Sequence, residues 1–551
     1  MHLAFVSVQN YRGLQALELT LGPLTTLIGE NSYGKSNLLD ALLAVLGPGS
    51  DGGGIPLLAD DFRDDDHGGF HPIELRLGFR ESSEGEWRRP PFTGLEQHVW
   101  HGPNGDRRLE LRVFARRSGD PARVETSLTF VDGADKQVGP VPPPALVECV
   151  RKHVPMVLLK ADRYFTRPSR ADETEHRAID LESRLAEEIG SLLGGLGDMH
   201  RPQVESEVQR GVEAAIEYVK RFGGDRLRRR MGPLLASGGH GIGASSTSRA
   251  IALLLILGPI LAQRTDIAFG PDCHPIIAIE DAEAHLHPIM LSSVASVIRA
   301  TPAQRIVTTN SGDLLAMLPL QSVRRIVREG EATRTFRIAR ESLSEDELRR
   351  IMYHVRANRG TSLFARAWLL VEGETEFWLL PELAAHLGID FGLEGIRCME
   401  FAQCGVAPLV KLANEMGIHW HLLADGDPAG ASYAAAASEF VRPKDADAHI
   451  TRLPDRDIEH SLWRAGYADI YRHAMGTASP RRLDRRPKVE NPTPTIERAL
   501  RARSKPGMAV AVADAVRAPN SPGVPPPLRH AIEATASLAR GAMPFNAISA
   551  P

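Results

Sequence analysis

Cysteine is scarce in this 551-residue chain, which contains only four. The four thiols, Cys149, Cys273, Cys398 and Cys404, are widely separated and form none of the closely spaced pairs that zinc sites use. This spacing argues against a structural zinc site and against a secreted domain held by disulfides. We expect buried or incidental thiols in a reducing cytosol.

Long apolar runs are absent as well. The longest, at 251–262, is shorter than the ~20 residues that span a bilayer. The first residues, MHLAFVSVQNYRG, show no basic segment followed by an apolar one, so no signal peptide is evident. We therefore expect a cytoplasmic protein without a membrane partner.

Net charge is small too, at −4 from 65 basic and 69 acidic residues. This balance excludes a strong overall attraction to nucleic acid, so a DNA site would have to be a local basic patch. The basic run at 481–488 is one candidate for gripping phosphates. The length and the 43% hydrophobic content predict two to four globular domains.

The most specific motif is GENSYGKS at 29–36, which has the spacing of a phosphate-binding loop. The apolar run at 24–28 predicts a buried strand before it, and 37–46 has the spacing of a helix. Backbone N–H groups at the helix start would face an anion, Lys35 would reach the β- and γ-phosphates, and Ser36 would ligate Mg²⁺. The sequence therefore predicts an ATP site with the loop residues Gly29, Asn31, Gly34, Lys35, Ser36 and Asn37.

Two further strands end in polar residues. Glu280 and Asp281 follow an apolar strand, and phosphoryl transfer requires such carboxylates to hold Mg²⁺ and to orient the attacking water. Another strand ends at Asn310, which is a candidate sensor of the γ-phosphate, with ordinary capping of a strand end as the alternative.

The segment AEAHLHP after Asp281 also raises a zinc alternative through Glu283, His285 and His287. Its spacing is not H-E-x-x-H, so positioning of the nucleotide site is the better interpretation. A Gly/Ser-rich turn at 240–255 opens an apolar helix, which is how a second anion site is built.

The motifs NYRGL, GENSYGKSNLLDAL and IEDAEAHLHP together resemble the ATP-binding-cassette ATPase fold of the SMC and RecF type over residues 1–340. The resemblance implies Glu280 as the Mg²⁺ acid and Asp281 as the catalytic carboxylate, where the family usually has Glu. It also implies a homodimer in which the turn at Ser245 and Ser246 closes over the nucleotide of the other chain. Ser246 replaces the usual glycine and Asn310 an often-found histidine, and these departures favour ATP binding with slow hydrolysis.

In the second half, two more apolar strands end in acids. RAWLLVEGETE ends in Glu372 and Glu376, and WHLLADGDPAG carries Asp425 and Asp427. Strand-end acids from neighbouring parallel strands form an all-oxygen site that suits Mg²⁺ or Mn²⁺ better than zinc. Two such ions activate water and stabilise the leaving oxygen in phosphodiester cleavage.

V-E-G-x-x-E followed by D-G-D resembles the Toprim fold of topoisomerases, primases and nucleases. The order of phosphate loop, EDAEAHLHP, VEGETE, ADGD and LPDRDIEHSL is similar to that of the OLD (overcoming lysogenisation defect) nucleases over nearly the whole chain. That resemblance implies metal-dependent cleavage of DNA. It implies, as site residues, the metal acids Glu372, Glu376, Asp425 and Asp427, a further acid Glu459 beside Asp457, and a C-terminal lysine, with Lys505 as the candidate and Lys488 as the alternative.

The expected fold class is α/β, with two domains of different type. Residues 1–165 and 236–340 would form an ABC/SMC-like ATPase domain, and 166–235 a helical insertion that serves as a dimerisation arm. A linker helix at 341–365 would lead to a Rossmann-like Toprim domain at 366–475 and a basic loop with a helical extension at 476–551.

We therefore expect an ATP-binding, Mg²⁺- or Mn²⁺-dependent DNA endonuclease that an ATPase dimer regulates. A role in phage defence, and a partner protein or nucleic-acid element, stay open. One alternative is an SMC/RecF-like DNA-repair ATPase whose Toprim domain only binds nucleic acid. Another is a topoisomerase or primase, although Tyr467 and Tyr471 lie in no domain of the kind that carries a transesterifying tyrosine.

Overall fold

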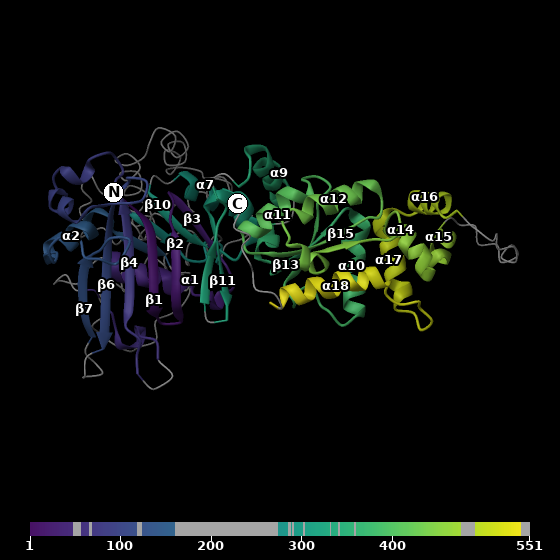
Figure 1. Cartoon of the computed structure of the whole chain (residues 1–551), viewed down its shortest axis with the longest axis horizontal. Coiled ribbons are helices and arrows are strands. Elements are labelled where there is room, and N and C mark those ends of the chain that lie inside the picture. The colour runs from purple at the N-terminus through teal and green to yellow at the C-terminus, as the bar shows by residue number, and fades with distance from the viewer. Residues whose placement is uncertain are drawn as a thin grey trace, which may run out of the picture. The chain divides into compact units, whose positions relative to one another are not determined.

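The computed structural model describes residues 1–47, 55, 57–64, 69–117, 124–159, 274–284, 288, 291–300, 303–330, 332–339, 342–356, 360–474 and 491–541. The chain divides into two compact units, Met1–Thr335 and Phe336–Pro551 (Figure 1). The expected helical insertion at 166–235 and the basic run at 481–488 lie outside the described residues.

An antiparallel sheet opens the N-terminal unit, with the strand order β2-β1-β4-β6-β5 and β7 paired to β6. Its strands alternate between buried and more exposed side chains, and β4 buries Ile73, Leu75, Leu77 and Phe79 in turn. This alternation is the reason the segment forms a sheet with one face in the core. The strands are β1 (His2–Tyr11), β2 (Leu14–Thr20), β4 (Ile73–Arg80), β5 (Trp100–His101), β6 (Arg107–Arg117) and β7 (Val124–Phe130).

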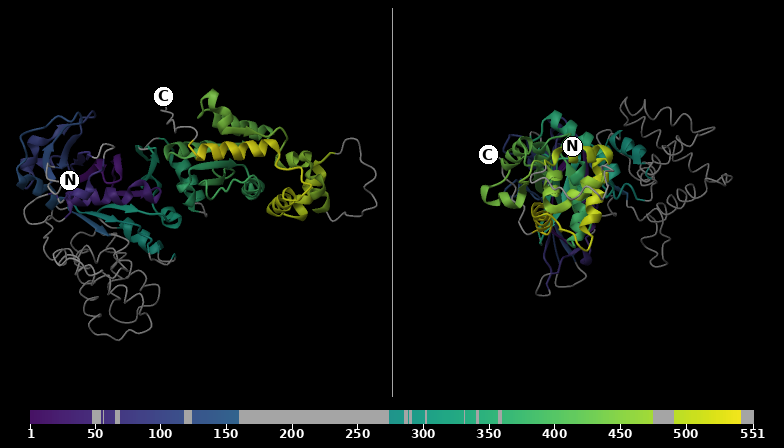
Figure 2. Two further views of the ribbon diagram at one scale, coloured as in Figure 1. Left: turned by 90° about the horizontal axis from the view of Figure 1, so that it is seen from below. Right: turned by 90° about the vertical axis from the view of Figure 1, so that its right-hand side faces the viewer.

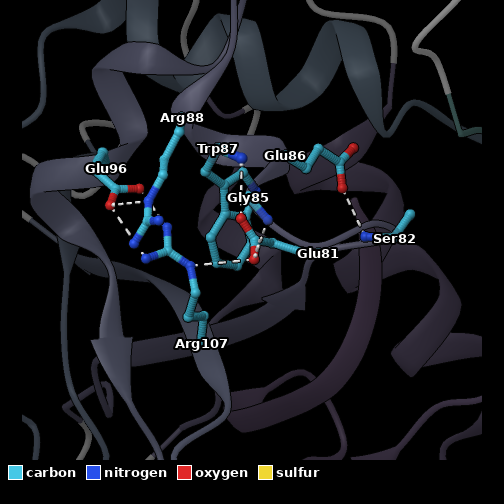
Figure 3. Close-up of polar contacts among 8 residues, drawn as sticks. All are labelled: Glu81, Ser82, Gly85, Glu86, Trp87, Arg88, Glu96 and Arg107. Atoms are coloured by element: carbon cyan, nitrogen blue, oxygen red, sulfur yellow. Dashed lines mark hydrogen bonds and ion pairs between the residues drawn. The ribbon is translucent and has the colours of Figure 1, made fainter.

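Hydrogen bonds and ion pairs connect the short helices η3 (Glu86–Arg88) and η4 (Thr93–His98) to β6 (Figure 3). Arg107 donates to Glu81 Oε2 and to Glu96 Oε1, each at 3.1 Å. Glu81 in turn accepts from the Trp87 backbone N–H at 3.0 Å and the Gly85 N–H at 3.3 Å. The Trp87 ring is fully buried in the core of this unit, and the Arg107 guanidinium lies 5.9 Å from the centre of the ring.

The mixed sheet of the same unit has the order β12-β11-β3-β10-β9-β8. Parallel pairing places Thr308 of β10 opposite Leu27 of β3, and Val307 opposite Ile279 of β9. The carboxyl ends of β3, β9 and β10 therefore meet at one edge of the sheet. Its strands and helices are β3 (Leu24–Ile28), α1 (Lys35–Leu46), α2 (Pro144–His153), β8 (Met156–Leu159), β9 (Ile276–Ile279), α7 (Leu291–Ala300), β10 (Gln304–Thr308), α8 (Gly312–Met317), β11 (Val323–Glu329) and β12 (Ala332–Phe336).

The C-terminal unit has a four-stranded parallel sheet in the order β14-β13-β15-β16. β13 is buried along its whole length, which fits its continuous apolar run AWLLV, since a central parallel strand is covered on both faces. These elements are α9 (Glu345–Arg356), β13 (Ala367–Val371), α10 (Glu374–His386), β14 (Ile396–Glu400), α11 (Val406–Glu415), β15 (His419–Ala424), α12 (Pro428–Ser438), α13 (Ala446–His449) and β16 (Ile450–Arg452).

A helical extension completes the C-terminal unit. Leu528 and Ile532 of α18 are fully buried, and Figure 2 shows this helix running alongside the sheet. The segment expected as a linker helix, α9, pairs Glu347 with Lys411 of α11 at 3.0 Å and so packs within this unit. The extension comprises α14 (Ile458–Leu462), the π-helical turn η10 (Trp463–Tyr467), α15 (Ala468–Ala474), α16 (Thr493–Ala502), α17 (Lys505–Val516) and α18 (Pro526–Ala539).

None of the helices in the described ranges combines the length and the hydropathy needed to cross a membrane.

Candidate nucleotide and metal sites

The phosphate-loop motif lies between β3 and α1, and two of its glycines have no room for a side chain. Gly34 has φ 88°, and a Cβ there would lie 2.4 Å from Leu14 Cδ2. Gly29 has φ 151°, and a Cβ would lie 2.5 Å from the Ile326 carbonyl oxygen. These contacts explain the glycine spacing of the motif, because only glycine fits both positions.

Lys35 begins α1 and its side chain is held inside the loop. The residue is 4% exposed, and its ammonium donates to the carbonyl oxygen of Gly29, to that of Glu30 at 3.3 Å and to Asn310 Oδ1 at 3.2 Å. Burial lowers the pKa of Lys35, and the carboxylates of Asp281 and Glu283 oppose that change. The loop lysine and the acids after β9 are therefore in electrostatic contact.

Asp281 and Asn310 meet at the shared edge of the sheet. The Asp281 backbone N–H donates to Thr308 Oγ1 at 2.8 Å, and its Oδ1 lies 3.2 Å from the same hydroxyl. Asn310 Nδ2 donates to Asp281 Oδ1 at 3.3 Å. A continuous line of hydrogen bonds therefore runs from Lys35 through the Asn310 amide to Asp281.

Glu283 also lies at this edge of the mixed sheet. Its Oε2 accepts from Thr309 Oγ1 at 2.6 Å and its Oε1 from the Asn310 backbone N–H at 2.7 Å. Both oxygens thus bind the end of β10, and His285 and His287 lie outside the described residues. The sequence analysis preferred positioning of the nucleotide site for the segment that contains Glu283, but it did not identify these partners, because they follow Glu283 by 26 and 27 positions.

The other predicted nucleotide residues are placed as follows. Asn31 and Ser36 are exposed beside the loop, and Glu280 contributes to the field at Lys35. The Asn37 amide nitrogen would lie 3.4 Å from a Cβ on Gly13, so α1 packs on the turn after β1. Ser245 and Ser246 lie outside the described residues.

In the C-terminal unit, the predicted acids follow the two central strands. Leu370 of β13 pairs with Leu422 of β15, so Glu372 and Asp425 leave the sheet at the same edge. The Gly426 N–H donates to the Asp455 carbonyl oxygen at 3.0 Å, and a Cβ on Gly426 would lie 2.1 Å from that atom. Glycine is therefore required where this turn packs on the loop after β16.

The acids perturb one another strongly. The pKa of Asp425 is raised to about 8, mainly by burial and in addition by the neighbouring charges of Glu376 and Glu372. The pKa of Glu376 is raised to about 7, mainly by burial and also by the charge of Glu459, whereas the charge of Lys505 opposes the rise. Such values identify a group of carboxylates that the fold holds together against their mutual repulsion.

Glu372 carries an unsatisfied atom within this group. Its Oε2 is buried and has no hydrogen-bond partner among the residues that the structure describes. Burial and the charge of Asp427 raise the pKa of Glu372, whereas Lys505 lowers it. A buried carboxylate oxygen without a donor is rare in folded proteins, and this oxygen is available as a ligand for a cation.

Two of the acids are fixed by local hydrogen bonds. Asp427 caps α12, where its Oδ1 accepts from the Gly430 N–H at 2.7 Å and leaves the second oxygen available. Glu459 is 6% exposed, and its Oε1 accepts from the hydroxyl of Thr375, which is 2% exposed, at 2.8 Å. The sequence offers Thr375 only as the residue between two acids of VEGETE, so this contact was not predicted.

Asp457, the neighbour expected beside Glu459, caps α14. Its Oδ1 accepts from the backbone N–H of His460 at 2.8 Å and lies 2.5 Å from His460 Nδ1. His460 Nε2 is 3.0 Å from Thr493 Oγ1 of α16. These contacts hold α14 against α16, and the charge of Asp457 contributes to the raised pKa of Asp425.

Lys505 is the lysine that the structure brings to these acids. A Cβ on Gly373 would lie 3.8 Å from Lys505 Nζ and 3.7 Å from Glu376 Oε2, so the two groups flank the same glycine. Lys505 is the first residue of α17, whose start Ser504 caps by accepting from the Gly507 N–H at 3.3 Å. The alternative, Lys488, lies outside the described residues.

The donor set fits a hard divalent cation. The described residues hold no three acids or imidazoles already converged on one point as metal ligands. The oxygens that would take part are those of Glu372, Glu376, Asp425, Asp427 and Glu459, a set suited to Mg²⁺ or Mn²⁺.

The two late tyrosines are not placed for transesterification. Tyr471 is fully buried, and burial raises its pKa above the ordinary value. The Tyr467 hydroxyl donates to the Gly523 carbonyl oxygen at 2.8 Å and lies 3.0 Å from Ser521 Oγ. A phenol that is buried, or whose hydroxyl is engaged in two hydrogen-bond contacts, is a poor nucleophile. This placement argues against the topoisomerase alternative.

Comparison with known proteins agrees with this geometry. Residues 1–231 and 242–362 match the model of the family described as "Protein of unknown function (DUF2813)". Residues 363–427, which hold Glu372, Glu376, Asp425 and Asp427, match the model "Overcoming lysogenization defect protein-like, TOPRIM domain".

Individual relatives extend over both units. The chain is 34% identical to the uncharacterized protein YbjD of Escherichia coli (strain K12) over 98% of this chain and 100% of the relative. It is 23% identical to the Old nuclease of Escherichia phage P2 over 78% of this chain and 77% of that protein. Among solved structures, the SmcHead bound to the C-winged helix domain of ScpA aligns with 62% of this chain and 98% of its own, at 13% identity and a TM-score of 0.34.

The phosphate loop between β3 and α1, the strand-end acids of the parallel sheet and the two family models lead to one assignment. The expected α/β fold class is confirmed. The chain belongs to the DUF2813 family, and its residues 363–427 form a Toprim domain of the overcoming-lysogenization-defect type.

Proposed function

We propose that this protein is an ATP-binding, divalent-metal-dependent DNA endonuclease. The observation that carries the proposal is the buried Oε2 of Glu372, which has no partner among the described residues and belongs to a group of carboxylates with raised pKa values. A fold that buries charged oxygens without donors loses stability unless a bound cation compensates them. The relation to the Old nuclease, a protein whose name states its activity, supports the same conclusion.

The proposed roles of the residues follow from their contacts. Glu372, Asp425 and Asp427 would bind the ions at the strand ends, and Glu376 and Glu459 would supply the remaining carboxylate ligands. A divalent ion there supplies the charge that activates water and stabilises the leaving oxygen. Lys505, exposed at the start of α17, would face a phosphate oxygen of the strand and stabilise its developing charge.

The N-terminal unit would bind ATP with Mg²⁺. Lys35 would engage the β- and γ-phosphates, Ser36 and Glu280 would hold Mg²⁺, and Asp281 would orient the attacking water. Gly29, Gly34, Asn31 and Asn37 would shape the loop around the phosphates. Ser245 and Ser246 of a second copy would close the site, which makes a homodimer part of the proposal.

Incubation of the full-length protein with supercoiled plasmid and Mn²⁺ or Mg²⁺ tests this function. We expect nicked and linear products from the wild type and at least a 100-fold loss in Asp425→Ala. Asp514→Ala is the matched control, because Asp514 is an exposed acid on α17 whose side chain is 72% accessible. Equal cleavage by Asp425→Ala and the wild type would refute the nuclease site, and binding of plasmid without cleavage would favour the DNA-repair ATPase alternative.

The same assay with and without ATP distinguishes the contribution of the N-terminal unit to cleavage from that of the C-terminal unit. Regulation by the ATPase predicts that cleavage by the wild type changes with ATP, whereas cleavage by Lys35→Ala does not. A role in phage defence, in the cytoplasm and with a partner or trigger from the phage, completes the proposal. It predicts fewer plaques on cells that carry the wild type than on cells that carry Asp425→Ala.

A further inference from the structure

Glu283 is a residue of the nucleotide edge to which the proposed function assigns no task. It lies in the turn that follows β9, which the Ala284 N–H closes on the Asp281 carbonyl oxygen at 2.7 Å. The Ala282 N–H donates to the Thr308 carbonyl oxygen at 3.2 Å, so this turn is also tied to β10 through the backbone. Glu283 adds a carboxylate clamp over the next two residues of the chain after β10.

The Asn310 side-chain amide, which extends from the backbone held by Glu283, contacts two groups of different charge. Asn310 Oδ1 accepts from the Lys35 ammonium at 3.2 Å, and Asn310 Nδ2 donates to Asp281 Oδ1 at 3.3 Å. An ammonium only donates and an ionised carboxylate only accepts, so these neighbours fix which way the amide faces. Glu283 fixes the backbone from which that amide extends, through the Asn310 N–H at 2.7 Å.

We propose that Glu283 is a positioning residue for ATP hydrolysis, which it supports by holding Asn310 between Lys35 and Asp281. The inference rests on the proposed ATP site. When the terminal phosphate of ATP takes the Lys35 ammonium, Asn310 Oδ1 loses that donor. The clamp keeps the Asn310 backbone in place at that moment, so its amide stays beside the phosphate and beside Asp281, which orients water. Displacement of a reacting group by about 1 Å can reduce a rate about 100-fold.

The test is a comparison of ATP affinity with single-turnover hydrolysis in the full-length protein. For Glu283→Ala we expect affinity within about threefold of the wild type and hydrolysis slower by about 10- to 100-fold. Glu283→Gln should stay within about threefold in both, because its oxygen can accept from the Asn310 N–H while its amide donates to the Thr309 hydroxyl. A residue that served only the fold would not separate affinity from turnover in this way.

A double-mutant cycle tests whether Glu283 acts through Asn310. Because both changes remove the same placed amide, Glu283→Ala with Asn310→Ala should be no slower than Asn310→Ala alone. Thr309→Val provides a second probe that keeps the buried volume and removes one donor to Glu283 together with the acceptor of the Ser311 N–H, so it should lower turnover and leave affinity unchanged. It also serves if Glu283→Ala proves unfolded by circular dichroism.

Three results would overturn the inference. These are wild-type turnover in Glu283→Ala or Thr309→Val, losses that multiply in the double variant, and parallel losses of affinity and turnover. Failure of the proposed function is seen in the wild type itself, as absence of ATP binding or hydrolysis, and it would remove the inference as well. Normal ATP binding and turnover in the wild type with no effect of Glu283 would remove the inference alone.

Discussion

The acidic group of the C-terminal unit should make the metal-free protein less stable as pH rises. Asp425 has a folded-state pKa of about 8 against a reference of 3.8. Between these values the folded protein keeps a proton that the unfolded chain has released, so the free energy of unfolding falls with rising pH. The loss begins near pH 4 and is complete above pH 8.

The size of the effect follows from the same two values. A difference from 3.8 to about 8 corresponds to about 6 kcal/mol of destabilisation at high pH. Part of it is repulsion from Glu376 and Glu372, which take up protons in place of Asp425. We therefore expect Asp425→Asn to recover about 1–3 kcal/mol at pH 8, or about 3–10 °C in melting temperature for a unit of this size.

Thermal melts in EDTA at pH 8 and pH 5 provide the assay. Four of the six tryptophans lie in the C-terminal unit, so intrinsic fluorescence reports mainly on this unit; they are Trp368, Trp378, Trp420 and Trp463. The stabilisation in Asp425→Asn should shrink at pH 5, and Mn²⁺ should stabilise the wild type more than the variant. Asp514→Asn, which neutralises an exposed acid of the same unit, should change neither quantity.

Two results would refute this reasoning. The first is an Asp425→Asn variant that is no more stable than the wild type at pH 8 without metal. The second is a gain of equal size at both pH values, since that would arise from packing and not from the charge.

Two further predictions concern the surroundings of the acids. Thr375→Val removes the donor to Glu459 without changing the buried volume, and should weaken Mn²⁺ binding about 10- to 100-fold by calorimetry, whereas Thr375→Ser keeps the hydroxyl and the affinity. Unchanged binding in Thr375→Val would show that Glu459 is not aimed at the ion. Gly426→Ala would place a Cβ 2.1 Å from the Asp455 carbonyl oxygen and should lower the free energy of unfolding by about 2–4 kcal/mol in urea titrations, and a wild-type midpoint would contradict this packing.

Much of the fold could be predicted because the strands carry their signals locally. β13 and β15 are short apolar runs that end in acids, and parallel pairing then brings those ends together. The strand–loop–helix around Lys35 is equally local, because the glycine spacing and the helix that follows lie within a few residues of each other. Periodicity and turn chemistry are enough for elements of this kind.

The contacts that complete both sites could not be predicted, because they join distant parts of the chain. Thr375 and Glu459 are 84 positions apart, and nothing in VEGETE distinguishes a threonine that donates to a buried acid from one that faces water. The choice between Lys505 and Lys488 depends on the packing of α17 against α10, which brings the Lys505 amine beside Gly373. Such pairings follow from tertiary packing, which a single sequence does not encode in any local pattern.

The two site lysines differ in how the fold holds them, and this difference should make the two activities separable. Lys35 is buried, and its ammonium donates hydrogen bonds to three protein oxygens, one of them on Asn310. The phosphates of ATP must therefore replace these protein acceptors in order to bind the Lys35 ammonium. Within the described part of the chain, Lys505 makes no hydrogen bond or ion pair, although Glu372 and Glu376 feel its charge. Its ammonium can therefore turn to an incoming phosphate without losing a protein contact.

Lys505→Met should keep ATP affinity and Mn²⁺ binding but lose plasmid cleavage, whereas Lys35→Met should lose ATP affinity at least 100-fold and keep Mn²⁺-dependent nicking. Titration with a fluorescent ATP analogue, beside the plasmid assay, measures both. A Lys505→Met variant with weakened ATP binding, or a Lys35→Met variant that no longer binds Mn²⁺, would show that the two lysines do not serve separate sites.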